Sequence, residues 1–249
     1  RGNRTDTAMV RIFNDRNELI RTMRWGVDTG FNRQYWGMEE KGVRQPGSPK
    51  PQPGADEPGG LPVFPGTYKL VMTYARTSDS AYITVKDDPR LGNRNDIKLA
   101  QKTMFDRLKK TSAKLTEGLD RLTEADEVCT KMQSQLKGLE GKDADSLRKA
   151  TTRTQDEIKK IREFINGKTS DKQGISRSPF EVTPMTQLQQ AQQFIFSKMV
   201  APGPQAEVLV GNAEKGVGEA VGRINTFFSG AWAAYRQQVE GTRLNLFKE

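Results

Sequence analysis

The sequence contains no histidine and only one cysteine, Cys129, among its 249 residues. Histidine is the commonest general base and the commonest metal ligand. Its absence therefore excludes Ser-His-Asp, Cys-His and histidine-based zinc sites within this chain. A single cysteine also rules out an internal disulfide. No stretch approaches the roughly 18 apolar residues that are needed to span a bilayer.

Apolar residues are scarce as well, at 34% of the chain, so we expect much of it to be long helix with one buried stripe. The net charge is +9, but residues 106–120 mix both signs, which is typical of an ordinary solvated surface. A basic module for anionic polymers is the alternative. The chain begins at Arg1 without a signal peptide, which predicts a fragment or processed product of a larger protein.

Short β-prone runs dominate the first third of the chain. Residues 10–13 and 19–23 flank a turn of Asn and Asp and predict a hairpin, and residues 31–36 predict a third strand. Residues 68–73 and 81–85 predict a second hairpin. Strands at this spacing, with no helical segment between them, indicate an Ig-like β-sandwich over residues 1–92.

A segment rich in proline and glycine, residues 42–62, interrupts these strands. Its composition predicts a flexible exposed loop with polyproline-like stretches. A docking motif for a proline-binding partner is the alternative.

The hydrophobic rhythm changes near residue 95, from every second residue to every third or fourth. Four amphipathic helices are predicted, at about 97–139, 144–166, 184–200 and 205–246. Short connections favour an antiparallel four-helix bundle over residues 96–249, so the predicted fold class is α+β multidomain. The fourth helix is rich in glycine, which indicates either close helix packing or a kink near residues 216–218.

Several side chains are functional candidates. Trp25, Tyr35, Trp36 and Tyr68 are compatible with a carbohydrate-stacking platform, although aromatic residues of a small sandwich are more often core. Cys129 falls on the apolar stripe of the first helix, which predicts a buried and inert thiol.

Acidic pairs are also candidates. Asp87-Asp88 lacks the regular oxygen-ligand spacing of a calcium site. Glu39-Glu40 and Asp56-Glu57 would suit a hydrolase only if two carboxylates faced each other across a cleft. We therefore predict no catalytic, cofactor-binding or metal-binding residue.

The N-terminal region resembles the Ig domains of the flagellar-hook-capping (FlgD-like) type. Residues 10–15 (VRIFND) and 18–23 (ELIRTM) match the first hairpin of these domains, residues 30–36 (GFNRQYW) match a middle strand, and residues 65–70 (PGTYKL) match a later one. Asn17 departs from the pattern, because a glycine usually occupies that position.

The order of this domain, an exit at residues 85–90 (VKDDPR) and a helical region resembles the C-terminal part of bacterial exported proteins with sortilin-like, BNR-repeat β-propellers. Such proteins are often labelled glycosyl hydrolases, but no active-site residue of that family maps onto this chain. The resemblance implies export to the periplasm, outer membrane or cell surface. It also implies a non-catalytic role, in which the chain packs against an upstream β-propeller or a cell-envelope protein.

Overall fold

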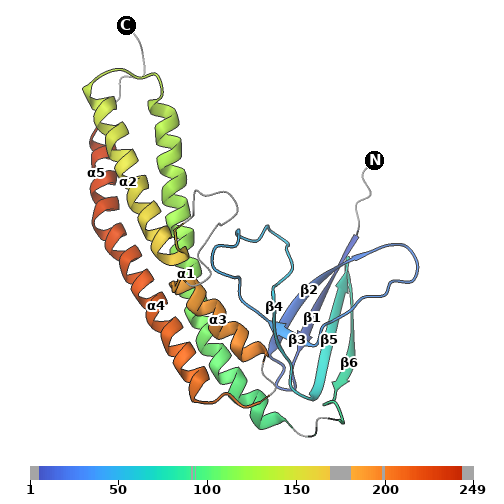
Figure 1. The fold of residues 1–249 in the computed structure, drawn as a ribbon. Coiled ribbons are helices and arrows are strands. Elements are labelled where there is room, and N and C mark those ends of the chain that lie inside the picture. The colour runs from blue at the N-terminus through green and yellow to red at the C-terminus, as the bar shows by residue number, and fades with distance from the viewer. Residues whose placement is uncertain (1–5, 91, 93, 169–180, 198–199, 243–249) are drawn as a thin grey trace, which may run out of the picture. The chain divides into compact units, whose positions relative to one another are not determined.

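The computed structural model describes residues 6–90, 92, 94–168, 181–197 and 200–242 (Figure 1). The chain divides into two compact units, one of residues 1–109 with 198–202, and the other of residues 110–197 with 203–249. The predicted domain boundary between residues 92 and 96 falls between the last strand and the first helix, and as a domain boundary it stays a prediction.

Four strands form one antiparallel sheet in the first unit, in the order β2-β1-β5-β6. They are β1 (Asp6–Phe13), β2 (Leu19–Val27), β5 (Gly66–Tyr74) and β6 (Thr77–Val85). The short strands β3 (Glu39–Lys41) and β4 (Gly59–Pro62) pair separately as a two-stranded ribbon. Both predicted hairpins are confirmed, as β1–β2 and β5–β6.

One face of the sheet carries the core of this unit. Alternate residues of β1 are buried, namely Ala8, Val10 and Ile12, because successive side chains of a strand point to opposite faces. The core cluster consists of Val10, Ile12, Met23, Val63 and Tyr68. Val63, which follows β4, brings the ribbon over this face.

The predicted Ig-like β-sandwich is wrong. A sandwich needs two sheets packed face to face, whereas the described residues form one four-stranded sheet and a ribbon. Residues 31–36, predicted as a strand, are irregular because the Asn32 side chain bonds to the backbone nearby. Its Oδ1 accepts from the Asp28 N–H at 3.0 Å and its Nδ2 donates to the Asp28 carbonyl at 2.8 Å. Phe31 and Tyr35 are 92% and 77% exposed rather than buried in a core.

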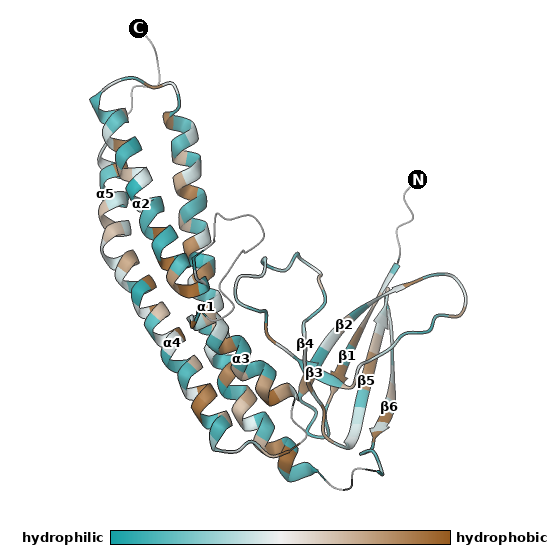
Figure 2. Ribbon diagram, viewed as in Figure 1, coloured by the Kyte–Doolittle hydropathy of each residue, from teal (hydrophilic) through white to brown (hydrophobic). Residues whose placement is uncertain are grey.

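Five helices are described: α1 (Asn95–Leu136), α2 (Lys142–Asn166), α3 (Pro184–Ser197), α4 (Pro204–Ser229) and α5 (Ala231–Gly241). In Figure 2 the long helices carry apolar and polar residues in alternation along their length, as amphipathic helices do. The predicted stripe of α2 is confirmed, since residues 147, 151, 154, 158, 161 and 165 are all buried. Most of the predicted α1 stripe is buried too, including Cys129.

The predicted antiparallel four-helix bundle is also wrong. Helices α2 and α3 follow one another along one line, and so do α4 and α5, whereas a four-helix bundle needs four helices side by side (Figure 1). The fourth predicted helix is divided at Gly230, whose φ and ψ are −109° and −93°. The sequence predicts one apolar stripe through this helix that includes Ala231 and Ala234. The break shifts the helical phase, so these two residues are not buried and Tyr235 is buried instead.

Three predictions fall partly outside the described residues. They are the end of the third helix at 198–199, residues 169–180 of the polar loop that the sequence predicts at 168–181, and the last residues of the fourth helix at 243–246.

Candidate functional site

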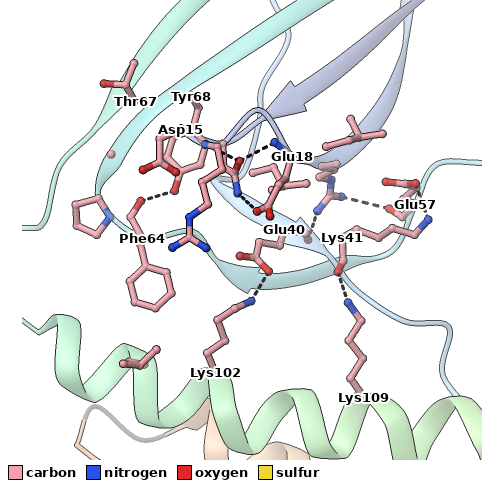
Figure 3. A pocket seen from close by; sticks show the side chains of 18 residues that line it. Asp15, Glu18, Glu40, Lys41, Glu57, Phe64, Thr67, Tyr68, Lys102 and Lys109 are labelled. Atoms are coloured by element: carbon pink, nitrogen blue, oxygen red, sulfur yellow. Dashed lines mark hydrogen bonds and ion pairs between the residues drawn. The ribbon is translucent and has the colours of Figure 1, made fainter.

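A polar cavity of about 740 Å³ lies in the first unit, between the loops of the sheet and the first turns of α1 (Figure 3). Its wall consists of the β1–β2 turn, the ribbon, the segment that leads into β5, and one side of α1. Lysines 102 and 109 of α1 point from the helix toward the ribbon. The cavity is therefore a candidate active site.

The β1–β2 turn is fixed by its own asparagines. Asn14 Oδ1 accepts hydrogen bonds from the Arg16 and Glu18 N–H groups at 3.1 and 2.8 Å, and Asn14 Nδ2 donates to the Glu18 carboxylate at 2.6 Å. Asn17 has a φ of 59°, in the left-handed region that glycine and asparagine tolerate best. This explains how asparagine can replace the glycine of the resembled pattern.

Two of the four carboxylates that line the cavity are each paired with a lysine. Lys102 Nζ lies 2.8 Å from Glu40 Oε2, and Lys41 Nζ lies 2.7 Å from Glu57 Oε1. The Thr22 N–H also donates to Glu57 Oε2 at 2.7 Å. The sequence-predicted pairs Glu39-Glu40 and Asp56-Glu57 thus come together in space, but as partners of cations and backbone donors.

Arg21 contacts both the segment of Glu39 and Glu40 and the segment of Glu57. It is 8% exposed, and its guanidinium donates to the carbonyls of Glu40 at 3.2 Å and Glu57 at 3.3 Å. It also lies 2.9 Å from the Glu39 carboxylate. Nothing in the sequence pattern marked Arg21 as a buried anchor, because arginine on a strand is usually solvated.

The electrostatics oppose acid–base chemistry at Glu57. Partial burial pushes the pKa of Glu57 upward, but the Lys41 ammonium, the Thr22 N–H and the Arg21 charge outweigh burial and lower it. A general acid in a hydrolase needs a raised pKa, so that it holds a proton near neutral pH. The lysine and backbone contacts stabilise the anion, which suits a structural role.

The four aromatic residues do not form one platform. Trp36 and Tyr68 pack edge to face in the core with ring centroids 5.5 Å apart, and the Tyr68 hydroxyl donates to the Phe64 carbonyl at 2.6 Å. Trp25 packs against the same core from β2, whereas Tyr35 is exposed on the irregular loop.

The other candidates are also accounted for by local contacts. Asp87 pairs with Lys98 at 2.6 Å and Asp88 with Arg90 at 2.6 Å, so both carboxylates of the suspected calcium pair have cationic partners. No group of three or more potential metal-ligating side chains occurs in the described part of the chain. Cys129 is buried, and burial raises the pKa of its thiol to about 11.

The two edges of the four-stranded sheet differ. On β2, the outward backbone groups are covered by side chains: Glu57 accepts from Thr22 N–H, Asp56 Oδ1 accepts from Arg24 N–H at 2.8 Å, and Gln34 donates to the Gly26 carbonyl at 3.0 Å. The proline- and glycine-rich segment, predicted to be flexible, therefore binds this edge through Asp56 and Glu57 in its latter part.

The opposite edge, β6, has no strand beyond it among the described residues. A two-residue turn joins β5 to β6, with Tyr74 and Thr77 facing each other across it. In such hairpins the flanking pair exchanges hydrogen bonds, so the backbone groups of every second residue, namely Ser78, Ser80, Tyr82 and Thr84, point away from β5. Sequence reasoning missed this open edge because it assumed a closed sandwich.

Comparisons with protein-family models, curated proteins and solved structures gave no match, so the resemblance to FlgD-like and sortilin-like proteins stays a prediction. Among the described residues, no helix is both long enough and apolar enough to cross a membrane.

Proposed function

We propose that this chain is a non-catalytic interaction module that binds a protein partner by adding a partner strand to the free edge of β6. The observation that carries the proposal is the contrast between the two sheet edges. An edge strand offers a row of backbone donors and acceptors to which another chain can pair. On β2 the backbone groups of Thr22, Arg24 and Gly26 are occupied by the chain's own side chains. On β6, among the described residues, such a contact covers one outward backbone group, the Ser80 N–H, which donates to the neighbouring Asp79 at 2.7 Å.

The composition of β6 supports strand addition. Its nine residues, TSDSAYITV, include one charged residue, Asp79, and no proline. Its pairing with β5 runs without a bulge from Gly66↔Val85 to Tyr74↔Thr77. Charges, prolines and bulges are the usual means by which proteins blunt an edge, and β6 has only Asp79, which accepts from the Ser80 N–H at 2.7 Å.

Exposed apolar side chains lie beside this edge. Tyr82 is 70% exposed and Ile83 is 40% exposed, on opposite faces of the sheet. A partner strand would cover part of both side chains, while main-chain hydrogen bonds supply affinity and alternate side chains supply specificity.

We propose a non-catalytic role because of the contacts made by the carboxylates of the polar cavity. Glu40 and Glu57 are each paired with a lysine, and the pKa of Glu57 is lowered rather than raised as a general acid requires. We further propose, on the resemblance alone, that the partner is an upstream β-propeller or a cell-envelope protein, and that the parent protein is exported.

Substitution of Ser80 tests the proposal. The Ser80 N–H points away from β5, so Ser80→Pro breaks no hydrogen bond between β5 and β6. It removes the N–H that donates to Asp79, and its ring obstructs an incoming strand. We expect Ser80→Pro to abolish capture of the partner by the intact parent protein, and Ser80→Ala to preserve it. Equal capture by both variants, with unchanged circular dichroism, would refute binding through β6.

A further inference from the structure

A second surface of the first unit has a chemistry unlike that of the polar cavity. A groove of about 730 Å³ lies on the core face of the sheet, at the end where β1 begins and β2 and β5 finish. It is lined by Asp6, Ala8, Trp25, Val27, Asp28, Thr29, Asn32, Gln34, Met72 and Tyr74. All of these residues belong to the first unit.

The groove has a small floor and aromatic sides. Ala8 of β1 is paired directly with Trp25 of β2. On the other side, Tyr74 of β5 reaches the N-terminal end of β1, since its hydroxyl donates to Asp6 Oδ2 at 2.6 Å. A methyl group between a tryptophan and a tyrosine leaves a slot for a flat or narrow group. Trp25 and Tyr74 are only partly buried, so their rings are available for contact.

Three side chains around the slot already donate hydrogen bonds within the chain. Asn32 Nδ2 donates to the carbonyls of Asp28 and Gly30 at 2.8 and 3.1 Å, and Gln34 Nε2 donates to the Gly26 carbonyl. The Tyr74 hydroxyl donates to Asp6. The carboxylates of Asp6 and Asp28 remain as acceptors for a ligand.

The charge of the groove is opposite to that of the whole chain. No lysine or arginine lines it, and neither Asp6 nor Asp28 has an ion-pair partner among the described residues. The chain as a whole carries a net charge of +9. In the polar cavity, by contrast, Glu40 and Glu57 are both paired with lysines. The groove therefore complements a positively charged group that supplies its own N–H donors.

We propose that this groove binds an arginine side chain of a partner polypeptide, with the guanidinium stacked between Trp25 and Tyr74 and bonded to Asp6 and Asp28. Arginine fits better than lysine because its planar, weakly hydrated guanidinium stacks on aromatic rings and offers several donors in one plane. The site goes beyond the proposed strand addition and does not depend on the β6 edge.

The test uses two capped pentapeptides, Ser-Arg-Ser-Arg-Ser and the same sequence with citrulline, titrated into the full chain at low salt. Citrulline keeps the shape and most donors of arginine but has no charge. Binding is followed by the nuclear magnetic resonance shift of the Trp25 indole N–H. We expect the arginine peptide to move this resonance and the citrulline peptide to leave it in place. Equal shifts with both peptides would overturn the proposal.

Two matched variants localise the site. Asp28→Asn removes a groove carboxylate, whereas Asp15→Asn removes an exposed carboxylate of the other cavity, so both change the net charge equally. We expect Asp28→Asn to raise the dissociation constant roughly five-fold, the effect of one charge-assisted contact, and Asp15→Asn to leave it unchanged. Equal weakening by both variants would show nonspecific attraction and overturn the site.

The Ser80→Pro variant separates this inference from the proposed function. It lies on β6, outside the groove, so it should bind the arginine peptide as the native chain does. Loss of partner capture with retained peptide binding would support both sites. Loss of peptide binding in the folded Ser80→Pro variant would contradict an independent groove.

Discussion

Replacing Gly218 with alanine should stabilise the helical unit. Gly218 lies inside α4, is exposed, and a Cβ built on it would meet no atom within 4 Å. Glycine in a helix interior is about 0.8–1 kcal/mol less favourable than alanine, because it loses more backbone freedom on folding. Gly218→Ala should therefore raise the free energy of unfolding by roughly that amount, or about 2–4 °C in melting temperature for a chain of this size.

Gly216, only two residues away, should respond differently. It is buried, and its Cβ would lie 2.3 Å from Gln187 Oε1 and 3.4 Å from Pro184 Cα on α3. Gly216→Ala must displace the Gln187 side chain, which offsets the gain in helix propensity, so we expect a change near zero. Gly216→Val adds bulk against the α3 backbone and should destabilise by about 1–3 kcal/mol.

The assay follows urea unfolding through the labelling of Cys129. This thiol is buried in the helical unit, so its reaction with a thiol reagent reports the opening of that unit rather than of the sheet. The double variant Gly216→Ala, Gln187→Ala provides a control, because removing the Gln187 amide should release the propensity gain. Destabilisation by Gly218→Ala as large as that by Gly216→Val would refute a continuous, exposed helix at Gly218.

Three further changes have defined outcomes. Burial raises the pKa of Cys129 from 9.0 to about 11, so labelling of the native chain at pH 8 should be at least about 100-fold slower than that of a free thiol. For the same reason, the native state should lose stability as the pH rises from 9 through 11. Rapid labelling of the native chain would contradict this. The lowered pKa of Glu57 means that its stabilising contribution is present above pH 4.5 and lost as the pH falls below that value. The protection of the Thr22 amide, taken relative to the intrinsic exchange rate at each pH, should therefore fall in acid, and at neutral pH this amide should exchange about ten-fold faster in Glu57→Gln. Gly42→Ala would place a Cβ 2.0 Å from the Gly59 carbonyl oxygen and should cost about 1–3 kcal/mol by urea titration of tryptophan fluorescence; an unchanged midpoint would contradict this ribbon packing.

Local periodicity predicted the elements but not their assembly. Alternation in residues 10–13 and 68–73 located β1 and β5, and the three-four stripe of α2 was correct at every position. The prediction of two packed sheets was wrong because alternation along a strand indicates which face is buried but not which element covers that face. Here part of the cover is the ribbon, which the sequence presented as a flexible loop.

Side-chain contacts and one backbone break explain the remaining errors. Asn32 turns residues 28–32 into an irregular loop despite their aromatic neighbours, and α4 ends at Gly230, whose φ and ψ of −109° and −93° are not helical. The cap that Asp56 and Glu57 place on β2 joins segments more than 30 residues apart, and no local pattern encodes such a contact. The one feature of the sequence that could have indicated this contact is the acidic pair Asp56-Glu57 within a proline- and glycine-rich segment.

The most direct test is residue-level amide hydrogen exchange of β6 in the isolated chain and in the partner-bound parent protein. Strand addition predicts that the outward amides of Ser78, Tyr82 and Thr84 exchange freely in the isolated chain and become protected on binding, while the Thr22 amide is protected in both states. Unchanged exchange at these β6 amides in a verified complex, with new protection elsewhere, would contradict binding through β6.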